Sequence, residues 1–205
     1  MLKTILGAAR LQNDCLEDIF SKQNFLFISF FVLIISCLCG AALPYLQPEG
    51  ARPFSIPEAA ISFLIQIVKN LFIFYITFIV GIVLLATIYR ITDEGINKNP
   101  QTNRLTFVRH LKLMSIAQMP RILGLIAVLP VIRDYRTLSG IILAASVFYV
   151  LVLIAKSLYV SFGYNKEKVT APYTKVFLVT IFCVLPSEMI FQLVIMNFVI
   201  TLLGV

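Results

Sequence analysis

Glu188 is the only charged residue between Val176 and Leu203, in the last apolar stretch of the chain. A carboxylate at membrane depth is costly, and such groups serve ion pathways, proton relays or pairing between helices. Pro186 lacks an N–H and therefore leaves an upstream carbonyl available to a partner or to water. Two interpretations follow: a conducting or proton-relay role for Glu188, and structural pairing with Lys156, Arg121 or a neighbouring glutamine. We favour the pairing.

Other polar residues interrupt the apolar stretches. Gln192 follows Glu188 by one helical turn, so both would share one face and could hold another helix by hydrogen bonds. Lys156 falls near the far end of its own apolar stretch. Lys69 divides a long helical stretch, and we expect it to be an interface anchor whose ammonium group reaches the membrane surface.

Residues 104–114 form a basic, amphipathic segment that leads into an apolar stretch between Pro120 and Pro130. Apolar side chains recur at helical spacing, and the expected polar side carries Arg104, Arg109, His110 and Lys112. This pattern predicts a helix on the cytoplasmic membrane surface that continues into a short span. Contacts to anionic lipid headgroups or to a partner are expected at Arg109, Lys112, Gln118 and Arg121. The alternative is that these are ordinary anchoring charges.

Residues for catalysis or metal binding do not gather in the sequence. The four cysteines have no paired ligand spacing, and His110 is the only histidine. Nothing matches a nucleophile elbow, a P-loop, a dinucleotide fingerprint or an HExxH motif. We therefore expect a non-enzyme with no cofactor and no metal. Basic residues follow the membrane borders rather than forming a soluble patch, so nucleic acid is not an expected partner.

The elements that position these residues are long apolar helices. The chain has 205 residues, of which 60% are hydrophobic and 13% charged, and its mean hydropathy is +0.94. These values indicate a multi-span membrane protein of one domain, residues 1–205.

Stretches of about 20 apolar residues predict an all-α bundle of five transmembrane helices. Amphipathic cytoplasmic helices are expected before spans one and three, the first of them over residues 2–22. The spans are expected at residues 24–46, 70–89, 115–132, 138–162 and 176–203. A re-entrant hairpin between Pro120 and Pro130 would reduce the number to four.

The distribution of basic residues predicts the orientation, because Lys and Arg concentrate on the cytoplasmic side. With five spans, one side collects Lys3, Arg10, Lys22, Arg90, Lys98, Arg104, Arg109, Lys112, Lys156, Lys166, Lys168 and Lys175. The other side collects only Arg52, Arg133 and Arg136. The N-terminus is thus expected in the cytoplasm and the C-terminus on the outer side.

Two stretches resemble the Yip family of Ypt/Rab-interacting membrane proteins, and in particular its bacterial members. Residues 5–11 and 15–19 are similar to the amphipathic opening that precedes the family's first span. Residues 105–107 and 117–120, with Leu129-Pro130, are similar to its third-span entry.

The resemblance implies an all-helical domain in the bacterial inner membrane with a cytosolic N-terminus. Eukaryotic members bind prenylated Rab GTPases or shape membranes. This chain lacks their Asp-Leu-Tyr-Gly-Pro motif, so a Rab-type GTPase is not an expected partner.

Together these features predict a non-catalytic scaffold, assembly factor or accessory subunit of a membrane complex. Expected partners are membrane lipids, other membrane subunits or further copies of the chain. The alternative is a small transporter or channel that uses Glu188.

Overall fold

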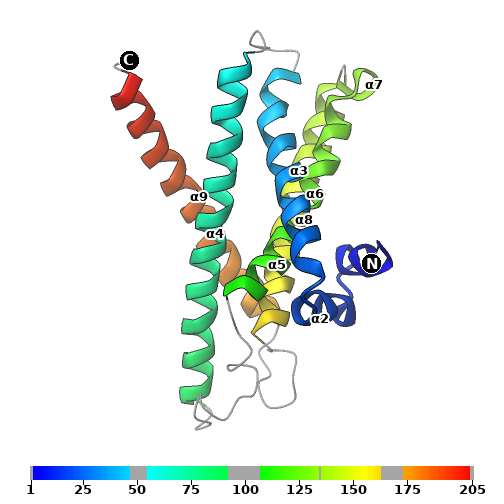
Figure 1. Cartoon of the computed structure of the whole chain (residues 1–205), viewed down its shortest axis with the longest axis vertical. Coiled ribbons are helices and arrows are strands. Elements are labelled where there is room, and N and C mark those ends of the chain that lie inside the picture. Colours follow the sequence, from blue (N-terminus) through cyan, green and yellow to red (C-terminus); the bar gives the residue numbers. More distant parts are fainter. Residues whose placement is uncertain (1, 47–54, 92–106, 134, 163–172, 204–205) are drawn as a thin grey trace.

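The computed structural model describes residues 2–46, 55–91, 107–133, 135–162 and 173–203, and every regular element within these ranges is a helix. Five helical segments are long and apolar enough to cross a membrane, as expected. They are α3 (Phe25–Leu46), α4 (Ile56–Ile91), the segment that begins with α5 (Phe107–Ala117), α8 (Arg136–Ser161) and α9 (Tyr173–Leu203). Figure 1 shows them running side by side along the long axis, with the end of α9 leaning away from the bundle.

α4 is one unbroken helix of 36 residues. The expected second span, residues 70–89, lies within this helix, but the apolar stretch that could cross a membrane runs from Ile56 to Leu84 and includes Lys69. α4 packs against α3 on one side and α9 on the other. This packing brings the middle of α4 to the middle of α9, and the candidate site lies there.

The third span is broken into short pieces. After α5 come α6 (Pro120–Leu123), the 3-10 helix η3 (Gly124–Val128) and α7 (Pro130–Arg133). Pro120 and Pro130 each begin a piece, because proline has no N–H to donate and fits the first turn of a helix. The pieces follow one direction along the bundle in Figure 1, and they do not return as a hairpin.

The expectation of a surface helix over residues 104–114 is wrong for the described part, which begins at Phe107. α5 lies inside the bundle and packs against α3, α4 and α8. Val108, expected on the apolar side, is 52% exposed, whereas His110 and Lys112, expected on the polar side, are 0% and 3% exposed. The assignment failed because both polar side chains find partners within the protein, which periodicity cannot anticipate.

The N-terminal helices α1 (Leu2–Ala9) and α2 (Asn13–Ser21) form a corner that packs against α5 and α8. Leu11, between them, has a left-handed backbone with φ of 63°. The contact is a cluster of buried apolar side chains: Ile5, Ala8, Leu16, Ile19, Phe20, Phe25, Leu113, Ile116 and Val160. The apolar stripes of residues 2–22 therefore include a face that packs against the bundle.

Candidate functional site

An ion pair joins α4 to α9 in the middle of the bundle. The ammonium nitrogen of Lys69 lies 2.9 Å from Oε1 of Glu188, and the two side chains are 10% and 28% exposed. Lys69 therefore does not act as the expected interface anchor. Glu188 pairs with a residue outside the expected set of Lys156, Arg121 and neighbouring glutamines. α9 packs against both α4 and α8, and the carboxylate meets the lysine of α4 rather than Lys156 of α8.

Gln118 lies at the break between α5 and α6. Its backbone carbonyl accepts a hydrogen bond of 3.0 Å from the N–H of Arg121 and another of 3.1 Å from the hydroxyl of Ser36 on α3. The carbonyl of Pro120 accepts one of 2.5 Å from Ser146 of α8. Serine hydroxyls of neighbouring helices thus donate to two carbonyls at the break, which is how an interrupted backbone is satisfied where water is absent.

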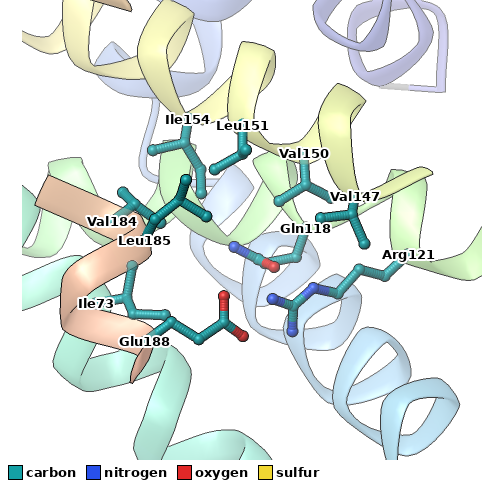
Figure 2. A pocket seen from close by; sticks show the side chains of 10 residues that line it. All are labelled: Ile73, Gln118, Arg121, Val147, Val150, Leu151, Ile154, Val184, Leu185 and Glu188. Atoms are coloured by element: carbon teal, nitrogen blue, oxygen red, sulfur yellow. The ribbon is translucent and has the colours of Figure 1, made fainter. Parts of the chain in front are cut away.

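The side chain of Gln118 has no such partner. It is 1% exposed, and its Oε1 makes no hydrogen bond in the described part of the chain. Figure 2 shows its amide group facing a pocket that Arg121 and Glu188 also line. Buried polar atoms normally form hydrogen bonds, so we expect a bound water molecule or ligand to form one with this amide.

The pocket lies between the break in the third span, α4, α8 and α9. It has a volume of about 20 Å³, above the roughly 10–15 Å³ that one water molecule needs. Its walls are otherwise apolar: Ile73, Val147, Val150, Leu151, Ile154, Val184 and Leu185. Within the described residues the Arg121 guanidinium has no carboxylate within 4.0 Å. The pocket therefore brings together an unpaired cation, an unpaired amide and one ion pair.

The residues expected to contact a headgroup or partner are divided between two places. Gln118 and Arg121 line this pocket. Lys112 lies next to α2 instead, where its ammonium group donates to the carbonyls of Phe20 and Lys22 at 3.0 and 2.9 Å. Arg109 is also there, with its guanidinium carbon 5.9 Å from the centre of the Phe20 ring. The expectation for Lys112 is corrected: this lysine holds the C-terminal end of α2, where a cation is favourable.

His110 links three helices. Its Nε2 lies 3.1 Å from the hydroxyl of Thr77 on α4, and its Nδ1 lies 3.3 Å from the hydroxyl of Ser161 on α8. Phe78 and Phe162 pack against the imidazole with ring centroids 5.4 and 5.8 Å away. In the described residues no group of three or more potential metal ligands occurs. His110 is a structural junction that the sequence pattern placed on the wrong side.

Lys156 and Gln192 do not join the pocket. The Lys156 ammonium group lies 5.4 Å from the ring centre of Tyr159 and 5.2 Å from that of Tyr173, a cation–π arrangement between α8 and the start of α9. Gln192 is exposed on α9. Glu188 and Gln192 therefore do not act on one partner helix, since the carboxylate is turned toward α4.

Sequence reasoning missed the partnership between Lys69 and Glu188. One signal was available: both residues sit within long apolar stretches, and a buried charge is tolerated best beside an opposite charge. Choosing between Lys69, Arg121 and Lys156 required knowledge of which helices are neighbours.

Comparison of the chain with protein families, with curated proteins and with solved structures found no match. The functional conclusion therefore rests on the residues and contacts described above.

Proposed function

We propose that the chain is a non-catalytic integral membrane protein that acts as a scaffold, assembly factor or accessory subunit of a membrane complex. Its partners are other membrane subunits or further copies of the chain, together with anionic lipids at the cytoplasmic face. We also propose that the chain is related to the bacterial Yip-like proteins that it resembles. Its proposed location is the bacterial inner membrane, with the N-terminus in the cytoplasm and the C-terminus outside.

The observation that carries the proposal is the exposed amide of Gln192 within the apolar helix α9. This side chain makes no hydrogen bond with the described part of the chain, and its neighbours Met189 and Leu193 are 65% and 64% exposed. An amide facing hydrocarbon has no water to bind, so a polar group on another helix is its natural partner. An interhelical hydrogen bond of this kind contributes about 1–2 kcal/mol in a membrane.

A second observation supports the same function. Gly140, Ala144 and Ala145 are exposed on α8, and no atom lies within 4 Å of the place where a Cβ on Gly140 would stand. Small residues let another helix approach closely. Gly81 and Gly40, in contrast, face Phe162 and Gln66 of the same chain.

The test is the replacement Gln192→Leu, with Met189→Leu on the same helix as the matched control. We expect the wild-type protein, extracted in mild detergent, to elute and weigh as a complex larger than one chain. Gln192→Leu should weaken that association about 5–30-fold, the equivalent of 1–2 kcal/mol, and Met189→Leu should not. Recovery of the wild-type protein only as a lone monomer in several detergents would contradict the proposal.

A small transporter or channel is the second candidate. The observation that favours it is the break in the third span at Gln118, beside the pocket that Glu188 lines, because transporters form their sites at interrupted helices. Solute or ion flux into proteoliposomes that Glu188→Gln abolishes, while complex formation persists, would favour the transporter over the scaffold.

A further inference from the structure

The charges around the pocket do not balance. Lys69 and Glu188 neutralise each other at 2.9 Å, and Arg121 contributes a further positive charge that no described carboxylate meets within 4.0 Å. Arginine stays protonated in proteins, so this charge cannot be removed by loss of a proton. An uncompensated cation at membrane depth is costly. The cluster is one negative charge short.

The amide of Gln118 offers a second donor at the same place. Its Oε1 makes no hydrogen bond with another described residue, and the two ends of an amide can exchange places by a half-turn. With its NH₂ turned to the pocket, Gln118 would donate beside the Arg121 guanidinium. Figure 2 shows both groups entering the pocket from the broken third span.

The size and the walls of the pocket define the ligand. About 20 Å³ is more than one water molecule needs, so a small ion fits. One monovalent anion balances the single excess positive charge, whereas a divalent phosphate or sulfate would exceed it. The apolar walls reduce screening, so charge attraction is strong there. Water would satisfy the amide but would leave the positive charge unbalanced.

We propose that this pocket is a binding site for one small monovalent anion, such as chloride, held by the guanidinium of Arg121 and the amide of Gln118. Lys69 keeps the Glu188 carboxylate from repelling the anion. The site does not depend on the scaffold function, because it concerns charge balance within a single chain.

The first measurement is thermal unfolding of the full-length protein in detergent, with gluconate replaced stepwise by chloride at constant ionic strength. A ligand that binds only the folded state raises the melting temperature Tm by mass action. We expect a saturating rise of at least about 2 °C, a similar rise with bromide, and none with sulfate.

Four variants connect the effect to the pocket. Arg121→Gln removes the unbalanced charge and should abolish the chloride effect. Lys69→Met frees Glu188 to neutralise Arg121 and should weaken chloride binding at least about tenfold, whereas Glu188→Gln adds a net positive charge and should tighten it. Arg10→Gln, at an exposed site, should leave it unchanged.

A chloride effect that is absent from the wild-type protein, or that persists unchanged in Arg121→Gln, would overturn the proposal and leave water as the occupant. Should Arg121→Gln fail to fold, chloride binding is tested by line broadening of the chloride-35 NMR signal in the presence of the wild-type protein and of Glu188→Gln. Broadening by the wild-type protein that is stronger with Glu188→Gln supports the site, and equal broadening by both overturns it.

Discussion

Glu188 illustrates how a single residue acquires its role from its surroundings. It pairs with Lys69 at 2.9 Å and shares the pocket with Arg121, so one carboxylate lies near two cations and neutralises one of them. Removing one partner of a buried ion pair leaves the other charge without a counter-charge in a low-dielectric environment. Glu188 is therefore the charged residue on which the stability of this cluster depends most.

The stability of charge variants should follow an order. Glu188→Gln leaves two cations uncompensated and should lower the free energy of unfolding toward the lower end of about 3–5 kcal/mol, because the Glu188 side chain is 28% exposed. Lys69→Met should cost less, since Arg121 can then take the carboxylate. Thermal unfolding in chloride-free buffer measures both. Glu58→Gln, at an exposed position on the same helix as Lys69, is the control, and equal losses for Glu58 and Glu188 would refute this order.

At the scale of elements, the helices are connected by polar side chains as well as by apolar packing. Lys112 of α5 holds the end of α2, and His110 of α5 touches both α4 and α8. Close approach of α4 to Phe162, at the end of α8, depends on Gly81. A Cβ at that position would overlap the Phe162 ring, so the ring or the helix would have to move.

Gly81→Ala and Gly140→Ala form a matched pair of substitutions in apolar helices. Gly81→Ala should destabilise the protein by about 1–3 kcal/mol, the usual cost of overpacking. Within a single chain, Gly140→Ala should be neutral or stabilising by up to about 1 kcal/mol, because alanine favours the helix and no atom of the chain lies within 4 Å of the place of its Cβ. Thermal unfolding of both in one detergent compares them. A Gly81→Ala variant as stable as Gly140→Ala would show that α4 and α8 are not in close contact at this position.

At the scale of the whole molecule, α1 and α2 lie beside the bundle near the start of α3, and α9 ends toward the opposite end (Figure 1). The expected spans leave most of the Lys and Arg residues on the side assigned to the cytoplasm. The side assigned to the exterior has only Arg52, Arg133 and Arg136. Such a bias sets the orientation of a membrane protein.

Reporter fusions test this orientation. A phosphatase that is active only outside the cytoplasm should be active when fused after Val205 and inactive when fused after Lys22. A green fluorescent protein that matures in the cytoplasm should give the reverse pattern at the same two positions. Activity of one reporter at both positions would mean an even number of crossings between them and would contradict five spans.

The sequence alone determined the class of the protein and its helices. The expected first span at residues 24–46 corresponds to α3 (Phe25–Leu46), and the expected second span at residues 70–89 lies within α4 (Ile56–Ile91). These predictions succeed because a membrane helix satisfies its own backbone hydrogen bonds, so the length of an apolar stretch is enough to define it.

Only the tertiary structure decided which polar groups meet. Lys69 and Glu188 are 119 positions apart, and no local pattern distinguishes this pair from Glu188 with Arg121 or Lys156. The same holds for Lys112 and His110, which periodicity assigned to a polar surface and which are buried. A charge in a low-dielectric interior takes whichever partner the packing of whole helices brings within reach, and that packing is a property of the assembled bundle.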